Sequence, residues 1–244
     1  MRIGRTGVTS RNASFHDGVL ADVMLSPLKL AVTLVFGIIA VMLFAWAIDW
    51  VFVFKIWPEG VNCLHDILVG DLGHGVSLAV QQGSSVGAIT GPANLLYSVI
   101  FETTGIDDMG RQFADGSVLS IPDTIIRRAY VAHREAIEAA MVGTQLLGVR
   151  IATLARFIPL LLLLYPIAAV DGLVQRAIRG ACGGRESASL YHRAKYLQIA
   201  VFGLGGIALL VWPGLVHWGR CTSLIVVTSS GLARVQWSYY KKHV

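Results

Sequence analysis

Four ionisable side chains lie in or beside long apolar stretches. Asp49 follows the first stretch, Arg156 precedes the second, Asp171 lies near the end of the second, and Arg234 lies in the fourth. A charge that faces lipid is costly, so such residues pair with one another or mark a functional site. If the first stretch runs outward and the second inward, Asp49 and Arg156 reach one depth, and Asp171 and Arg234 another. We predict two structural ion pairs; the alternatives are unpaired charges that reach the membrane surface, and a proton or ion relay.

A short part of the chain gathers side chains of the types that bind metal ions, namely His65, Asp66, Asp71 and His74. Their spacing matches neither HExxH nor paired CxxC. We therefore interpret them as a solvated helix face, and predict no metal site and no cofactor. Because no catalytic motif such as GxSxG accompanies the serines or cysteines, we also predict no catalytic residue.

The three cysteines, Cys63, Cys182 and Cys221, form an odd set. The topology inferred below places Cys182 inside and Cys63 outside, with Cys221 near the outer boundary. A disulfide between Cys63 and Cys221 is one interpretation, and unpaired thiols are the favoured one.

The element that must carry Asp49 is an uncharged run of nineteen residues, Leu30 to Ile48. At about 1.5 Å per residue, such a helix crosses roughly the ~30 Å hydrocarbon layer of a bilayer. The chain as a whole is 55% hydrophobic and only 14% charged, which is too apolar for an ordinary soluble domain. We interpret the run as a retained anchor rather than a cleaved signal peptide, because it is longer than a signal core and a long mixed segment precedes it.

Three further apolar stretches predict an all-α, polytopic membrane protein with about four transmembrane helices. The expected membrane-spanning segments are residues 30–54, 151–175, 196–217 and 221–238. A helix that starts near Pro122 is expected to run without interruption into the second of these segments.

The distribution of Lys and Arg predicts the orientation, because basic residues collect on the cytoplasmic side. Residues 1–29, the loop 176–195 and the tail 239–244 are basic, whereas residues 55–150 hold six basic and ten acidic residues, a net charge of −4. We therefore expect a cytoplasmic N-terminus and C-terminus in a bacterial inner membrane, crossed several times. Residues 55–150 would form a periplasmic segment of short, loosely amphipathic helices that rest on the membrane or on each other. The overall charge of +5 then reflects topology, and no direct contact with nucleic acid is expected.

The loop between the second and third segments is a candidate docking site. Its polar and aromatic residues are Arg176, Arg179, Arg185, Glu186, Ser187, Tyr191, His192, Arg193 and Lys195. The basic residues either only enforce the topology or recognise anionic lipid headgroups or an acidic partner; nucleic acid is the least favoured partner.

The same loop carries a family resemblance. Asp171-Gly172-Leu173-Val174, Gly184-Arg185-Glu186-Ser187 and Tyr191-His192-Arg193-Ala194-Lys195 are its most specific parts, and Trp57-Pro58-Glu59 and Tyr240-Lys241-Lys242 add to it. Over roughly the whole chain, the sequence resembles the integrating conjugative element membrane protein family. The resemblance implies a bacterial inner-membrane protein that takes part in conjugation, plausibly beside a type IV secretion apparatus, and it transfers no catalytic residue.

Two function classes follow. The first is a non-enzymatic membrane component of a DNA transfer system, whose partners are membrane lipids and other membrane proteins of the transfer or secretion apparatus. The second is a small transporter or membrane enzyme that uses Arg156 and Asp171. We favour the first mainly because of the family resemblance, and because the first and third apolar stretches contain almost no polar side chains. The oligomeric state does not follow from the sequence.

Overall fold

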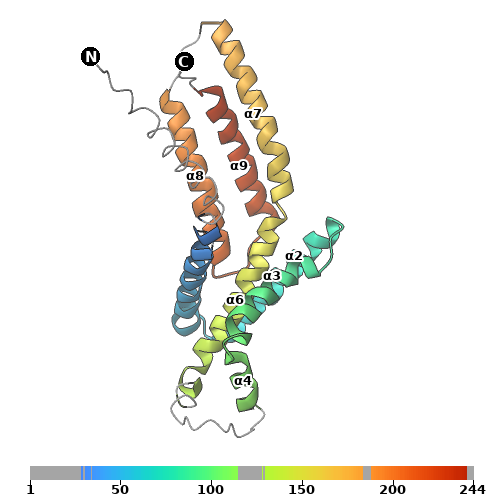
Figure 1. Ribbon diagram of the computed structural model, residues 1–244, viewed down its shortest axis with the longest axis vertical. Helices are drawn as coiled ribbons and strands as arrows, with labels where there is room; N and C mark the ends of the chain where they lie inside the picture. The colour runs from blue at the N-terminus through green and yellow to red at the C-terminus, as the bar shows by residue number, and fades with distance from the viewer. Residues whose placement is uncertain are drawn as a thin grey trace, which may run out of the picture. The chain divides into compact units, whose positions relative to one another are not determined.

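The computed structural model describes residues 29, 31–33, 35–114, 128, 130–183 and 188–240, and within these every regular element is a helix. The chain divides into two units, Met1–Leu43 and Phe44–Val244. In the first unit the described residues are helical, with exposed apolar side chains such as Val35 and Phe36. The elements of the second unit are η1 (Phe52–Ile56), α2 (Val61–Gln81), α3 (Gly87–Tyr97), η2 (Ser98–Glu102), α4 (Ile106–Ala114), α6 (Arg134–Ala155), α7 (Ile158–Ala181), α8 (Ala188–Val211) and α9 (Trp218–Ser238) (Figure 1).

Three helical stretches are long and apolar enough to cross a membrane, judged by length and composition. They are Ala31–Ile56, Arg134–Ala181 and Ser189–Val211. The prediction of an all-helical, membrane-associated chain is confirmed at this level for the described residues. The helix α9 is not among the three, because Arg220, Arg234 and a series of Ser and Thr residues interrupt its apolar character. A fourth membrane-spanning segment, the orientation and the periplasmic location of residues 55–150 stay predictions.

The helix expected to enter the second apolar stretch without interruption is divided into α6 and α7. Residues Arg156 and Phe157 form a turn between them, and Pro159 lies in the first turn of α7. Proline lacks an amide N–H and its ring clashes with the carbonyl four residues earlier, so it favours the start of a new helix. The helices on the two sides of the turn differ in burial: α6 has eleven buried residues, whereas in α7 only Gly172 is buried.

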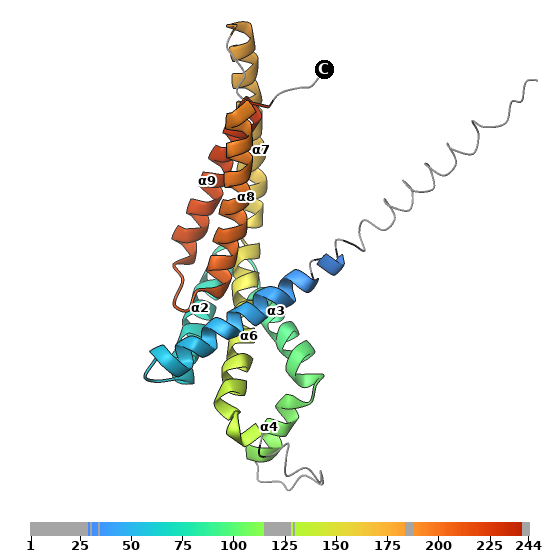
Figure 2. The same cartoon turned by 90° about the vertical axis from the view of Figure 1, so that its left-hand side faces the viewer.

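The helices α2 and α3 cross α6 and pack on it (Figures 1 and 2). Their shared core includes Leu64, Ile67, Ile89 and Leu146. The approach of α3 to α6 is close: a Cβ atom at Gly148 would lie 2.4 Å from the Cα of Ala93. The short helices of this segment thus pack on each other around α6, which fits one of the arrangements expected from the sequence.

The helix α9 lies between α7 and α8 (Figure 1). The contact with α7 is close at Gly172, where a Cβ atom would lie 2.5 Å from the carbonyl oxygen of Arg234. At the far end of α7, Gly183 has a φ of 68°, the left-handed conformation that commonly ends a helix.

Candidate functional site

The buried face of α2 carries one carboxylate. Leu64, Leu68 and Asp71 occur at i, i+4 and i+7, so they share one face of the helix. Asp71 is 0% exposed and lies in the core with the two leucines. The interpretation of Asp71 as part of a solvated face is therefore wrong, because the residue continues the apolar stripe of α2. The neighbours His65, Asp66 and His74 are exposed.

The partner of Asp71 is Arg150, which α6 brings into the same core. Its side chain is 1% exposed, and its Nε donates a hydrogen bond of 2.8 Å to Oδ2 of Asp71. The remaining guanidinium nitrogens point to the last turn of α8 and to residues 212–217, which form the α8–α9 connection. Nη1 donates to the carbonyl oxygens of Trp212 at 2.6 Å and Leu210 at 3.2 Å, and Nη2 donates to that of Gly214 at 2.9 Å.

The second oxygen of the carboxylate binds the same connection. Oδ1 of Asp71 accepts from the backbone N–H of Val216 at 3.4 Å and from the indole N–H of Trp218 at 3.3 Å. Packing adds to these bonds, since a Cβ atom at Gly70 would lie 2.4 Å from Cδ2 of Leu215. The ion pair therefore joins α2, α6 and the α8–α9 connection at one point.

This arrangement suits a structural role. Buried charges are tolerated when they are paired and hydrogen-bonded, and both charges here are. The guanidinium makes four hydrogen bonds and the carboxylate accepts three, so neither group is directed toward an open site. Removing one partner would leave the other charge buried and unpaired, which costs about 3–5 kcal/mol in comparable proteins.

Of the two ion pairs predicted from the sequence, the structure brings one together. Nε of Arg234 on α9 contacts Oδ2 of Asp171 on α7. The two side chains are 50% and 48% exposed, so the protein itself does not enclose the pair. Within the protein alone, this contact adds little stability; a role as a structural pair stays a proposal.

The structure does not bring Asp49 and Arg156 together. Asp49 is buried against α6 at Gly143, where a Cβ atom would lie 2.7 Å from its Oδ2. Along α6, Gly143 precedes Arg156 by thirteen residues, or about 20 Å. Among the described residues, Nη2 of Arg156 is buried and has no hydrogen-bond partner.

Within the described part of the chain, no group of three metal-binding side chains comes together. The exposed ring of His74 is hydrogen-bonded through Nδ1 to the carbonyl oxygen of Gly70 at 2.8 Å. The thiols of Cys63, Cys182 and Cys221 are free, so the structure shows the unpaired arrangement.

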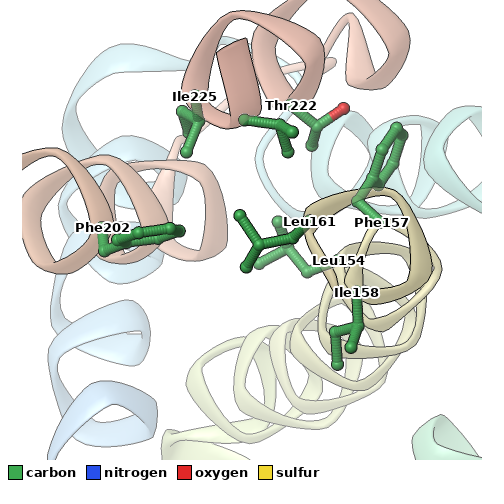
Figure 3. A pocket seen from close by; sticks show the side chains of 9 residues that line it. Leu154, Phe157, Ile158, Leu161, Phe202, Thr222 and Ile225 are labelled. Carbon is green, nitrogen blue, oxygen red and sulfur yellow. The ribbon is translucent and has the colours of Figure 1, made fainter. Parts of the chain in front are cut away.

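A cavity of about 200 Å³ lies beside the turn between α6 and α7. The side chains of α6, α7, α8 and α9 that surround it are almost all apolar, as Figure 3 shows for Leu154, Phe157, Ile158, Leu161, Phe202 and Ile225. The polar exception is Thr222, whose hydroxyl donates to the carbonyl oxygen of Trp218. Neither Arg156 nor Asp171 lines this cavity.

Comparison with known proteins adds a family to this geometry. Residues 58–235 match the model of a family described as DtrJ-like, IncC plasmid conjugative DNA transfer protein DtrJ-like. The chain belongs to this family. The prediction of a family associated with conjugative transfer is thus confirmed. No curated protein and no solved structure matches the chain.

The DtrJ-like match covers the buried ion pair and leaves out the first apolar helix. It includes Asp71, Arg150 and the α8–α9 connection, and it begins after Asp49. The residues that join α2, α6 and the α8–α9 connection therefore lie within the part of the chain that matches the family model.

The candidate docking loop lies only partly within the described residues. Arg185, Glu186 and Ser187 lie outside them, whereas Arg176 and Arg179 are on α7 and the remaining residues are on α8. Arg193, Lys195 and His192 are exposed. The sequence did not indicate that the end of α9 lies against this candidate docking loop. The guanidinium carbon of Arg179 lies 4.0 Å from the ring centroid of Tyr239, which follows α9.

Proposed function

We propose that this DtrJ-like chain is a non-enzymatic, multi-pass component of the bacterial inner membrane that acts in a conjugative DNA transfer system. In this role it positions other membrane proteins of the transfer apparatus, which we expect to be related to type IV secretion. The family match supports the link to conjugative DNA transfer, and the three long apolar helical stretches support the membrane location.

The proposal that the chain is not an enzyme rests on the bonding partners of its buried charged side chains. The side chains of Asp71 and Arg150 form hydrogen bonds with each other and with the α8–α9 connection, and these bonds hold α2 and α6 against that connection. A rigid joint of this kind suits a protein whose task is to hold two helical parts in a defined relation. The outer surface of the segment packed on α6, such as the exposed Leu95 of α3 and Val99 of η2, is then available to partner proteins.

A transporter or membrane enzyme would need Arg156 and Asp171 on one polar path. The two residues are fifteen positions apart on α7 and its preceding turn, or about 22 Å. The cavity beside that turn is apolar, and Asp171 contacts Arg234 at a half-exposed surface. These observations favour the component over the transporter.

A complementation experiment in donor cells tests the proposal. The gene is deleted in frame, and the deletion is complemented with the wild-type chain or with an Arg156→Gln/Asp171→Asn double variant. We expect the deletion to abolish transfer to recipients, and both chains to restore it. If the double variant accumulates in the membrane but does not restore transfer, the two charges act directly and the component proposal fails. Normal transfer by the deletion strain would contradict a role in conjugation.

A further inference from the structure

At one end of the α7–α9 bundle, basic and aromatic side chains from all three helices form one cluster. We define the basic-aromatic cluster as Arg176, Arg179, Tyr191, Trp237, Tyr239 and Tyr240. We propose that this cluster binds the phosphate headgroups of anionic phospholipids, with Arg176 and Arg179 as the principal ligands.

Aromatic rings hold the two guanidinium groups in place. The guanidinium carbon of Arg179 lies 4.0 Å from the ring centroid of Tyr239, and that of Arg176 lies 5.7 Å from the ring centroid of Tyr240. Arg179 also donates from Nη1 to the carbonyl oxygen of Ser238 at 3.3 Å. A guanidinium group stacked on a ring, as that of Arg179 is on Tyr239, directs N–H groups outward at its edge, where they can match the oxygens of a phosphate.

Ring contacts join the third helix to this arrangement. The ring centroid of Tyr191 at the start of α8 lies 5.8 Å from that of Tyr240. The ring centroid of Trp237 lies 5.9 Å from that of Tyr240. Because α7, α8 and α9 each contribute, the positions of the arginines depend on the packed bundle rather than on one flexible segment.

The charge around the cluster is strongly positive. Residues 176–195 contain five Lys and Arg residues and one acidic residue, Glu186, and Lys241 and Lys242 follow Tyr240 in the sequence. The exposed Arg193 and Lys195 follow Tyr191 on α8. The carboxylate that lies closest along α7, Asp171, contacts Arg234. Such a surface attracts anions.

The apolar surface of α7 favours a lipid over an acidic protein as the source of that anion. Exposed apolar side chains such as Leu163, Ile167 and Val170 cover the middle of the helix, and Ile178 is exposed between Arg176 and Arg179. Along α7, Arg176 follows Arg156 by twenty residues, or about 30 Å, which equals the hydrocarbon thickness. If α7 spans the membrane, as the proposed function requires, the cluster lies at the level of the headgroups.

Lipid retention by the full-length protein tests the proposal. The detergent-solubilised chain is equilibrated with equal amounts of phosphatidylglycerol and phosphatidylcholine, and the lipids that stay bound are counted by native mass spectrometry. The test variant is Arg176→Gln/Arg179→Gln. The matched control, Arg111→Gln/Arg220→Gln, removes two positive charges away from the cluster.

We expect the wild-type chain and the control to retain phosphatidylglycerol preferentially, and the preference of the test variant to fall by about threefold or more. An Arg176→Lys/Arg179→Lys variant should keep part of it, because the charge stays and the planar donor group is lost. If the test variant aggregates, Arg179→Gln alone is used, and the same loss of preference is expected at smaller size.

An unchanged preference in the test variant, or an equal loss in the control, would overturn the proposal. Release of the lipid by excess inorganic phosphate would assign the cluster to a soluble phosphate compound instead. Unchanged lipid retention together with loss of a crosslink to an acidic protein would assign it to a protein partner. Failure of the proposed function is distinguished separately, because it would appear as release of the wild-type chain from membranes by carbonate or as normal transfer without the gene.

Discussion

Asp71 and Arg150 are 79 positions apart in the sequence and form a fully buried ion pair with a separation of 2.8 Å. Through it, the α8–α9 connection is bonded to both α2 and α6. The pair therefore joins the helices around α6 to the α7–α9 bundle, beside apolar contacts of Leu78 and Leu154 with Leu209, Val216 and Trp218.

The first prediction concerns the removal of one partner. Asp71→Asn or Arg150→Met should lower the free energy of unfolding by about 3–5 kcal/mol, because the remaining group stays buried without its counter-charge. The double variant Asp71→Asn/Arg150→Met should lose less than the sum of the two single changes. Denaturant titration in mixed micelles measures these differences. Additive losses would contradict direct coupling between the two side chains.

The second prediction contrasts this pair with the half-exposed one. Asp171→Asn should change the free energy of unfolding by no more than about 1 kcal/mol, because Asp171 and Arg234 are about half exposed and the protein fully desolvates neither. The same titration compares it with Asp71→Asn, which makes the same chemical change at a buried site. A loss of stability in Asp171→Asn as large as that in Asp71→Asn would show that lipid or a partner protein shields the Asp171–Arg234 pair.

The sequence predicts the contact between Asp171 and Arg234 but not the ion pair between Asp71 and Arg150. Asp171 and Arg234 interrupt apolar stretches that would otherwise be continuous, so their contact could be expected from the cost of an unpaired charge. Asp71 and Arg150 lie in a segment of mixed composition, where a charge carries no such signal. The usable signal was the spacing of Leu64, Leu68 and Asp71 on one helix face.

The expected pairing of Asp49 with Arg156 shows a different limit. It depended on placing Arg156, at the outer end of the second apolar stretch, at the same depth as Asp49. In the structure α6 extends well before Arg156, and Asp49 meets it at Gly143. The depth of two residues cannot be matched from the sequence when the helix that carries one of them begins far earlier than its apolar part.

The third prediction concerns the crossing of α3 and α6. Gly148→Ala should destabilise the fold by about 1–3 kcal/mol, because the new methyl group would meet the backbone of Ala93, which has no room to move. The control is Gly73→Ala on α2, where a Cβ atom has no neighbour within 4 Å. That change should be neutral or stabilise the helix by up to about 1 kcal/mol. Equal effects of the two variants on the thermal midpoint would refute the close crossing.

The fourth prediction concerns pH. The hydroxyl of Tyr97 donates to Oδ1 of Asp107 at 2.7 Å. Burial, followed by this hydrogen bond and the charge of Asp107, raises the pKa of Tyr97 above its usual value of about 10. The resulting contribution to stability is complete below that value and is lost as the pH rises through the higher pKa of the folded state.

Tyrosinate absorbance of the folded chain measures this pKa. We expect Tyr97→Phe to remove one late-ionising tyrosine from the titration and to weaken the attachment of α4, because Asp107 then loses the donor from Tyr97 and keeps the contact with Arg111 on its own helix. A titration curve that keeps the same late-ionising groups in Tyr97→Phe would assign the shift to another tyrosine.

Site-specific photocrosslinking in mating donor cells tests the central claim most directly. A photoreactive residue at Leu95 on the exposed face of α3 samples the neighbours of the packed helices, and one at Leu163 samples those of α7. A membrane component of the transfer apparatus predicts specific crosslinks to membrane proteins encoded by the transfer genes, which disappear in a strain lacking those genes. Crosslinks that are identical in both strains would contradict the account.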